Sequence, residues 1–516
     1  MKYTISGYPS LGENQELLKA ESAYWKHEID AETFKAQIEA LKLKQIREEK
    51  EAGLDWIPAD FTLFDAMADM AWMLHVVPQA AEELPLSELD KYFAFCRGLQ
   101  EGELDIPAAP LGYWLDWQSC TVVPVLDDTV NLHLRGDAFL NDYRLYRDKA
   151  GVETRPVLIG PYTFLKWAKY PGSKKAENFQ QDIIKAYQDM LSFADDNQVA
   201  WMTFVEPAWA LERIDEEDLV LLRQLYEGLL PAKKNVKVAL QIPAGCPDPR
   251  VLDVLNELDL AGLELDLAHS NENLVWLETA PWPEERVLFA GLASGSEIWK
   301  TDYAFAWQVL ESLKVKIPEL VVSTSCSLRF LPYTVRWETP LPRAIWRQLA
   351  FAREKLAETA EIARLQELPE EEREHIIRAR RRLVRHRPKP AGFSRELVEE
   401  TLDMLDERGL MRNLDQLLYR PLPETGPYDW SSEGVRGVEN VYATREAWVL
   451  VQGGKAAHPL IVWAPMRWKK GSFQFLTEVG RERFVSQFRY LYGPAGVSTF
   501  NVQVQVARLM LLRMRL

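Results

Sequence analysis

For residues 1–367, the sequence predicts an α/β fold in which strands and helices alternate and close into a (β/α)8 TIM-type barrel. The first observation is a set of six strand-length apolar runs, at 156–161, 202–207, 238–242, 262–266, 287–292 and 320–327. The second is that most segments between these runs have apolar residues at helical spacing. A nearly continuous apolar run is typical of a strand buried on both faces, and alternation with helices indicates parallel βαβ units.

Further elements are predicted around this core. Apolar residues at helical spacing in the highly charged segment 13–52 indicate a pair of surface-packed helices that extend the barrel at its N-terminal side. A first strand is expected at 53–58, a largely helical stretch at 59–106, and a connecting loop at 107–113. Helices are also expected at 178–197 and 342–366.

A second region is expected at 368–516. It begins with a helix at 370–387 whose C-terminal half is basic and which Pro388 and Pro390 end. A smaller α+β region should follow, with strand-like segments at 447–451, 459–464 and 502–506. The basic helix has two readings, a solvated helix with its apolar residues packed inward or a contact surface for a polyanion or protein.

The charge distribution bears on the partners that the chain can bind. The chain of 516 residues has a formal net charge of -16, and residues 371–516 hold 24 Lys and Arg against 17 Asp and Glu. That part is therefore at +7, which leaves -23 for residues 1–370. Phosphate binding depends on clustered cations, so the acidic part is not expected to bind nucleic acid.

Localisation is predicted from what the sequence lacks. It contains no run of about 18 uncharged apolar residues, and its first residues lack the apolar core of a signal peptide. Four cysteines without a CxxC pair are typical of reduced thiols. We therefore expect a cytoplasmic protein that contacts no membrane.

Polar residues at the predicted strand ends are the candidate functional groups, because barrel enzymes bind ligands there. Glu206 follows the run at 202–207 and could serve as an acid, a base or a structural acceptor for backbone amides. Asp266, His269, Cys246 and Cys326 also follow strands. They are zinc-ligand types, but their spacing is not a metal signature, so a polar mouth with two ordinary thiols is the other reading.

The residues at these positions resemble those of the cobalamin-independent methionine synthase family, in its N-terminal barrel. The matching segments lie at 7–12, 16–25, 52–58, 156–163, 206–208, 290–292, 298–299 and 325–328. A fainter similarity to the start of the family's second barrel covers 448–461 and 492–497.

The resemblance implies a fold of two face-to-face barrels and methyl transfer from 5-methyltetrahydropteroyl-polyglutamate to homocysteine. In the family the second barrel holds a catalytic zinc, and the first helps to hold the glutamate tail of the folate. The zinc ligands are not found in this sequence, so no cofactor is expected and the chain is predicted to be catalytically incomplete alone. A separate protein partner could supply the zinc barrel, and a non-catalytic binding or assembly module is the alternative.

The sequence departs from the family where the polyglutamate should bind. A run of Gln15, Glu16, Leu17 and Leu18 stands in place of Arg-Glu-Leu-Lys, and Tyr113 replaces a further Lys. Cations strengthen polyanion binding through charge-assisted hydrogen bonds, and Lys19 is the neighbouring cation that could partly substitute. A small ligand, folate-like or of another kind, is therefore expected to contact residues from this set: Gln15, Glu16, Lys19, Tyr113, Glu206, Asp266, Trp299, Ser325 and Cys326.

Overall fold

The computed structural model describes residues 1–101, 104–114, 119–211, 214–243, 245–338, 343–385, 466–469 and 472–475. The strands predicted at 447–451, 459–464 and 502–506 lie outside these residues, and the proposed division at 368 stays a prediction.

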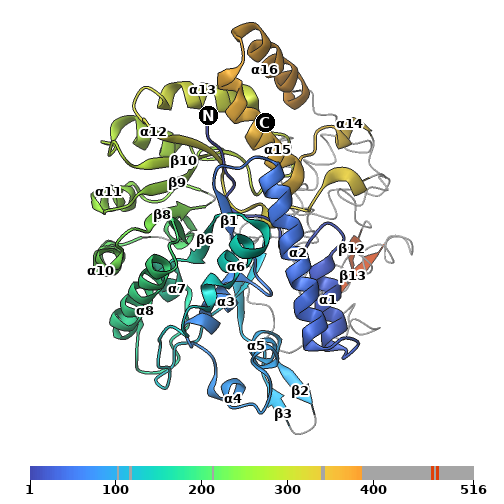
Figure 1. Cartoon of the computed structure of the whole chain (residues 1–516), viewed down its shortest axis with the longest axis vertical. Coiled ribbons are helices and arrows are strands. Elements are labelled where there is room, and N and C mark those ends of the chain that lie inside the picture. Colours follow the sequence, from blue (N-terminus) through green and yellow to red (C-terminus); the bar gives the residue numbers. More distant parts are fainter. Residues whose placement is uncertain are drawn as a thin grey trace.

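A parallel sheet forms the centre of the protein (Figure 1), and seven strands follow one another in the order β1-β6-β7-β8-β9-β10-β11. Their bounds are β1 (Ile57–Ala59), β6 (Thr154–Ile159), β7 (Trp201–Val205), β8 (Lys237–Ile242), β9 (Gly262–Asp266), β10 (Val287–Ala293) and β11 (Leu320–Thr324). All six predicted runs contain a strand. The predicted α/β fold class is confirmed.

Residues at the N-terminus join the two edges of this sheet. Tyr3 forms a parallel bridge with Val322 of β11, and Thr4 forms one with Trp56, directly before β1. The Thr4 amide donates to the Val322 carbonyl at 2.8 Å. Tyr3 and Thr4 thus occupy the eighth position of the barrel. The strand predicted at 53–58 is present as β1, but it is not the first element of the barrel along the chain, because this two-residue bridge precedes it and is too short to show an apolar run.

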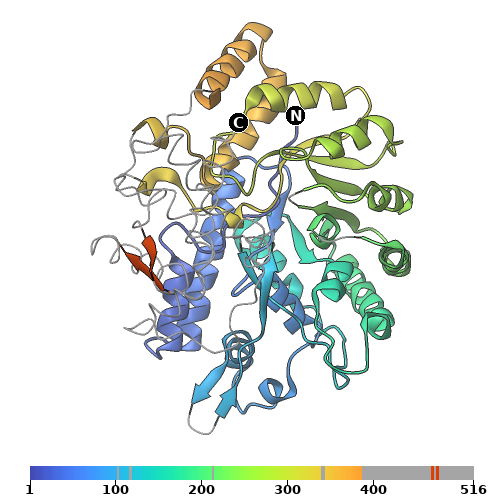
Figure 2. The same ribbon diagram turned by 180° about the vertical axis from the view of Figure 1, so that it is seen from behind.

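Helices cover the outside of the sheet. In Figures 1 and 2, α8, α10, α11, α12 and α13 follow one another around its outer face. Their bounds, with the neighbouring short helices, are α7 (Pro161–Trp167), α8 (Ala176–Asp196), α9 (Ala208–Leu211), α10 (Glu216–Leu229), α11 (Pro249–Glu257), α12 (Asn271–Thr279) and α13 (Tyr303–Leu313). The helix predicted at 178–197 is confirmed as α8. The one predicted at 342–366 is instead two helices, α14 (Arg343–Trp346) and α15 (Ala352–Arg364).

The N-terminal extension is a helical pair, as predicted, formed by α1 (Glu16–Trp25) and α2 (Ala31–Glu51). Between β1 and β6 the chain forms α3 (Ala66–Met73), α4 (Gln79–Glu82), α5 (Glu88–Arg97), η1 (Ala138–Leu140), α6 (Asn141–Leu145) and η2 (Tyr146–Ala150). Two hairpins interrupt this stretch, β2 (Leu99–Glu101) with β3 (Leu104–Ile106) and β4 (Leu111–Trp114) with β5 (Ser119–Val122). The loop prediction for 107–113 is therefore wrong from residue 111 onward.

Side chains fill the lower part of the barrel in layers. Trp56, Trp201 and Phe289 meet edge to face with ring centroids 5.7 to 6.1 Å apart. Above them lies an ion pair that is almost fully buried, in which both Arg155 Nη atoms lie 3.3 Å from Glu264 Oε2. The open space of the barrel is consequently at the carboxyl ends of the strands.

The basic helix α16 (Glu370–Arg385) packs against α13. Arg380 forms ion pairs with Glu358 and Glu361 and lies 4.0 Å from the Tyr303 ring centroid. Ile377 is buried, as the inward-packed reading predicts. Farther along, β12 (Met466–Lys469) and β13 (Ser472–Phe475) form an antiparallel pair. Among the described residues, none of the helices has the length and apolar character needed to cross a membrane.

Candidate functional site

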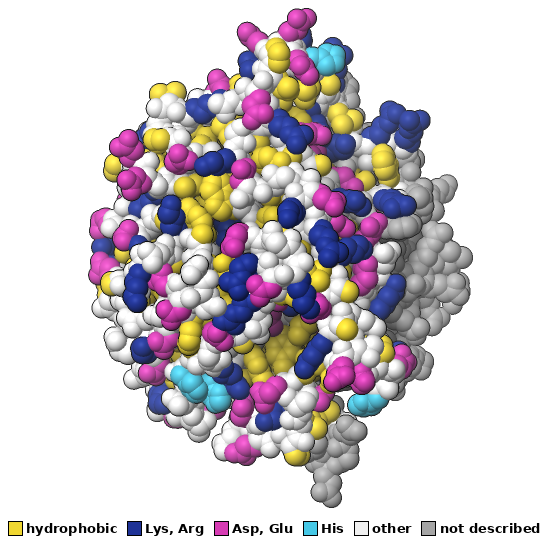
Figure 3. Space-filling view, in the orientation of Figure 1, with side chains coloured by type: hydrophobic (Ala, Val, Ile, Leu, Met, Phe, Trp, Pro, Cys, Tyr) yellow, Lys and Arg dark blue, Asp and Glu magenta, His cyan; other side chains and the backbone are white. Residues whose placement is uncertain are grey.

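A cavity of about 420 Å³ opens at the carboxyl ends of β1, β6, β7 and β8. Its floor is built by residues that these strands and the N-terminal segment turn toward the barrel axis: Ser6, Asp60, Val157, Ile159, Val205 and Gln241. Figure 3 shows a hollow with a hydrophobic floor beside α2 and α3. Its volume is in the range of small-molecule sites.

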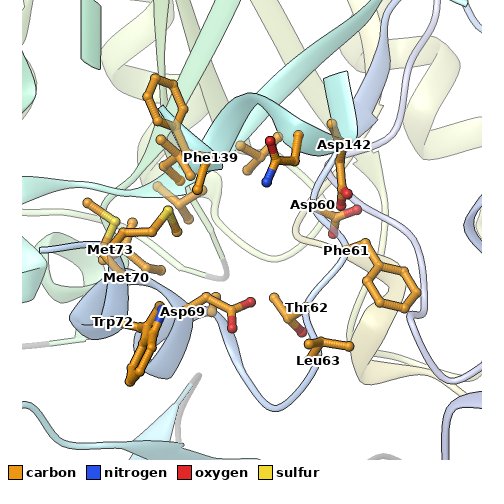
Figure 4. A pocket seen from close by; sticks show the side chains of 18 of the residues that line it. Asp60, Phe61, Thr62, Leu63, Asp69, Met70, Trp72, Met73, Phe139 and Asp142 are labelled. Carbon is orange, nitrogen blue, oxygen red and sulfur yellow. The ribbon is translucent and has the colours of Figure 1, made fainter. Parts of the chain in front are cut away.

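The walls of the cavity come from segments outside the sheet. The β1–α3 connection and α3 supply Phe61, Thr62, Leu63, Asp69, Met70, Trp72 and Met73, while η1 and α6 supply Phe139 and Asp142. In Figure 4 the two methionines and Phe139 lie on one side, and Asp60 and Asp142 lie on the other. The site therefore combines an apolar wall with several carboxyl groups.

Asp60 is held by its surroundings. Its Oδ1 accepts from the Tyr8 amide at 3.1 Å, and its Oδ2 accepts from the Ser327 hydroxyl at 3.1 Å. Burial raises the pKa of Asp60, and the charge of Arg329 partly offsets this. Gly7 is required beside it, since a Cβ at that position would lie 2.0 Å from Asp60 Oδ2.

Asp69 has fewer partners. The Tyr92 hydroxyl donates to its Oδ1. Burial raises the pKa of Asp69 to about 7; the Tyr92 hydrogen bond lowers it and the charge of Asp65 raises it further. An isolated carboxyl in a low-dielectric site is more easily protonated, which is the cause of this direction.

Two basic residues of the cavity, Lys42 and Arg329, already have partners. Lys42 forms an ion pair with Asp142 at 2.7 Å and lies 4.6 Å from the Phe61 ring centroid. Arg329 donates to the Thr62 hydroxyl. The charge of Lys42 is thus paired with a neighbouring carboxylate of the wall, and the Arg329 guanidinium is held against Thr62.

The structure places Glu206 behind the cavity, fully buried, as an acceptor. The amides of Tyr162 and Thr163 at the start of α7 donate to it at 3.1 and 2.7 Å, and the Tyr226 hydroxyl donates at 2.6 Å. Burial raises its pKa to about 7 against the effect of these bonds. This geometry favours the structural reading, in which the carboxyl joins β7 to α7 and α10.

Asp266 and His269 form a second polar cluster, after β9. The His269 Nδ1 lies 2.9 Å from Asp266 Oδ2, and the amides of Gly245, Ala268 and His269 donate to the same carboxylate. Burial works to lower the pKa of His269, but Asp266 prevails and raises it to about 9. At neutral pH the pair is therefore an ion pair.

The remaining predicted residues near this cluster are Ser325, Cys326 and Trp299, all buried. The Ser325 hydroxyl accepts from the Gly295 amide at 3.1 Å. Burial raises the pKa of the Cys326 thiol, so it stays protonated, and its neighbour Asp266 acts in the same direction. Trp299 forms an isolated bridge with Leu349.

The N-terminal candidates lie elsewhere. Gln15 has a left-handed backbone and precedes α1. Glu16 forms an ion pair with Lys44 at 2.9 Å, and Lys19 is exposed on α1. Tyr113 lies in β4, opposite Cys120. Of the eight predicted residues whose side chains the structure describes, all but Tyr113, none lines the cavity, whose further lining residues include Lys35, Glu88 and Tyr92.

Residue types that bind zinc do not converge in the described ranges. Within them, no three side chains of His, Cys, Asp or Glu lie close enough together to hold a metal ion. The Asp266–His269 pair has only two such groups, and the protonated thiol of Cys326 is a poor ligand. The described part of this chain therefore does not fit the zinc of the family.

The cavity carboxyls Asp60 and Asp69 are not among the residues that the sequence predicts for the site. Asp60 follows β1 directly, so the rule that polar residues at strand ends are candidates could have found it. Asp69 lies within a helix, and its position in the cavity depends on how α3 packs. No pattern in the sequence indicates that.

Comparison with known proteins defines the class. Residues 2–318 match the family model described as "Cobalamin-independent synthase, N-terminal domain", more than half of the chain. The chain belongs to the cobalamin-independent methionine synthase family, with the barrel of its N-terminal domain.

Particular relatives agree. The chain is 33% identical over 364 residues to a 5-methyltetrahydropteroyltriglutamate–homocysteine methyltransferase of Lactococcus lactis subsp. lactis, covering 70% of this chain and 47% of the relative. It is 30% identical to the protein of that name from Campylobacter jejuni, covering 75% and 51%. The chain thus spans about half the length of these relatives. A solved structure described as "Putative Vitamin-B12 Independent Methionine Synthase from Listeria monocytogenes" has the same fold, with a TM-score of 0.50 at 15% identity over 72% of this chain and all of the other.

Proposed function

We propose that this chain is a ligand-binding barrel for methyl transfer of the methionine synthase type, which needs a metal-bearing barrel from another protein for turnover. The reaction would be transfer of a methyl group from 5-methyltetrahydropteroyl-polyglutamate to homocysteine, the activity that the relatives are named for. The observation that carries the proposal is the cavity at the carboxyl ends of the strands in a barrel of this family.

The residues present suit this chain to ligand binding and leave activation of the thiol to another barrel. The cavity can enclose part of a small molecule between apolar side chains and carboxyl groups. The zinc ligands of the family are not found in the sequence, so in this proposal another barrel supplies the activation of the homocysteine thiol. A cytoplasmic location, as expected from the sequence, is part of this proposal.

The test combines metal analysis with an activity assay. The purified full chain is assayed for zinc and for methionine formation from homocysteine and 5-methyltetrahydropteroyl-triglutamate, alone and with the separately expressed C-terminal half of the Lactococcus relative. We expect a zinc-free chain that is inactive alone and active in the mixture. Stoichiometric zinc with turnover by the chain alone would overturn the proposal.

The second candidate is a non-catalytic binding or assembly module. Gln15, Leu18 and Tyr113 stand where the family has cations, and Glu16 is already paired with Lys44, which favours this candidate. It predicts ligand binding in the cavity without methionine formation in either assay. Cell fractionation of the tagged chain checks the location.

A further inference from the structure

Asp69 is a cavity carboxyl that forms no ion pair with a described residue, and the charges of Arg329 and Lys42 lower its raised pKa only in part. Asp142 is paired with Lys42, and Glu88 lies 3.5 Å from Lys91. The pKa of Asp60, although raised by burial, is lowered in part by the charge of Arg329. In the described part of the chain, no Lys, Arg or His forms an ion pair with the Asp69 carboxyl.

The position of Asp69 leaves one of its oxygens available. The side chain comes from α3 and reaches the cavity between Trp72 and Thr62 (Figure 4). Its Oδ1 accepts from Tyr92, whereas the described residues provide no donor to Oδ2. A ligand that donates a hydrogen bond would complete the set of partners for this carboxyl.

The surroundings favour a positive charge over a negative one. Met70 and Phe139 are buried beside Asp69 in a low-dielectric wall, where an ion pair is stronger than in water. Two more buried carboxyls lie near those of the cavity, Glu21 of α1 beside Asp69 and Glu49 of α2 beside Asp60. Both Glu21 oxygens and Glu49 Oε2 have no hydrogen-bond partner among the described residues. Burial raises the pKa of both Glu21 and Glu49 well above the usual value, so they stay neutral, and the ionised form of Asp69 is the group that disfavours an anion here.

From this geometry we propose that the cavity binds a compact planar organic cation, such as an amidinium or guanidinium group, with Asp69 as the carboxylate that receives it. The inference rests on the proposed function only in taking the cavity as the ligand site. An amidinium presents two parallel N–H donors, so one can reach Asp69 Oδ2 while its plane lies along the apolar wall.

Protonation should couple to this binding. The pKa of about 7 at Asp69 means that the carboxyl is partly protonated at neutral pH, and a bound cation favours its ionised form. The charged or titratable groups that surround Asp69 from the packed elements are Glu21 on α1, Lys42 on α2, Asp65 on α3, Tyr92 and Cys96 on α5, and Arg329 after β11.

Three probes of nearly equal size and shape separate charge from shape: benzamidine (cationic), benzamide (neutral) and benzoate (anionic). Their binding to the full chain is measured by calorimetry, with tryptophan fluorescence as a second readout because Trp72 lines the cavity. We expect affinity in the order benzamidine, benzamide, benzoate. Benzamidine should bind about tenfold more tightly at pH 8 than at pH 6, since a group with a pKa of about 7 goes from about 10% to about 90% ionised.

The variant Asp69→Asn should weaken benzamidine binding by about tenfold or more, remove its pH dependence and leave benzamide binding little changed. Glu88→Gln is the matched control: it also removes a lining carboxyl, but one already paired with Lys91, and should change benzamidine affinity less than about threefold. Urea unfolding of each variant identifies any loss of folding.

Three results would each overturn the inference. Equal or tighter binding of benzoate, or an Asp69→Asn variant that binds benzamidine as the wild type does, would exclude Asp69 as a cation receptor. Failure of all three probes to bind would exclude the cavity for ligands of this size. None of these results decides the methyl-transfer assay, which uses other ligands and a partner, so the two proposals fail separately.

Discussion

Replacing Glu264 by Gln should destabilise the barrel more than any single substitution on its surface. Besides its contact with Arg155, Glu264 accepts from Gln241 Nε2 at 3.0 Å and from the Ser323 hydroxyl at 2.9 Å. The Ser6 hydroxyl donates to it as well. These partners come from separate positions around the barrel, so the carboxylate joins strands that are distant in sequence.

The magnitude follows from the burial of the pair. Arg155 and Glu264 are each about 1% exposed. Removing one partner of such a pair leaves the other charge buried and uncompensated, which costs about 3 to 5 kcal/mol. In addition, the substitution replaces one carboxylate oxygen, which accepts hydrogen bonds, by an amide nitrogen. This nitrogen is itself a donor and would face the donors that surround Glu264. Since domains are stable by about 5 to 15 kcal/mol, the variant should lose a large fraction of its stability.

The assay is urea unfolding followed by tryptophan fluorescence, because Trp56 and Trp201 lie directly below the pair. Glu319→Gln is the control: it makes the same chemical change in a surface ion pair, with Lys2 at 3.8 Å, in which both side chains are more than half exposed. The control should change the unfolding free energy by less than about 1 kcal/mol. The double variant Arg155→Met with Glu264→Leu should recover part of the loss, because neither charge is then left alone.

The reasoning is refuted if Glu264→Gln costs no more than its surface control. That result would mean that water or a rearranged Arg155 satisfies the charge, and that the filled barrel interior inferred from the burial of this pair is open to solvent.

Three further predictions concern other parts of the fold. Burial raises the pKa of Glu206 from an ordinary 4.5 to about 7, so between these pH values the folded chain keeps a proton that the unfolded chain releases. Wild-type stability should therefore fall by up to about 3 kcal/mol as pH rises through this window. Urea titrations from pH 4.5 to 8 should show that Glu206→Gln lacks this pH-dependent loss, and identical profiles of the two proteins would contradict the prediction. Gly295→Ala should lower the unfolding free energy by about 3 kcal/mol, because the new Cβ would lie 2.1 Å from the Cys326 carbonyl oxygen. Gly136→Ala meets nothing within 4 Å and should lower it by only about 1 kcal/mol, owing to the left-handed backbone at that position. Thermal unfolding compares the two variants, and equal losses of stability would refute the close contact. Arg380→Ala should loosen α16 from α13 and α15, because Arg380 contacts the Tyr303 ring of α13 and pairs with Glu358 and Glu361 of α15. Amide exchange in 370–385 should become faster in this variant but not in Arg378→Ala, which changes an exposed residue. Unchanged exchange in Arg380→Ala would show that these contacts do not hold the helix.

Much of the barrel could be predicted because its strands are buried on both faces. Each such strand must be apolar along its whole length, and this leaves a local pattern that can be read without knowing its neighbours. The Tyr3–Thr4 position lacks such a pattern, since it contributes one bridge to each side and depends on β11, more than 300 residues away, for its partner. The break between α14 and α15 was likewise missed, because helical spacing continues across it.

The candidate site was only partly predictable for a related reason. The rule of strand ends identified Glu206, Asp266 and Cys326, and the structure does place them after β7, at the end of β9 and after β11. Which strand end becomes a cavity depends on the segments above it. Over β7 the start of α7 closes on Glu206, whereas above β1 and β6 the helices α3 and α6 form walls of the open cavity.

The sequence by itself determined the class of fold and the family, because strand burial and the order of matching segments are properties of the chain. Tertiary structure decided which carboxyls face open space. Glu206 and Asp69 both have a pKa raised to about 7 by burial, yet one is enclosed by backbone amides and the other reaches a cavity. That difference arises from contacts between residues far apart in sequence, and a pattern within any one segment cannot contain it.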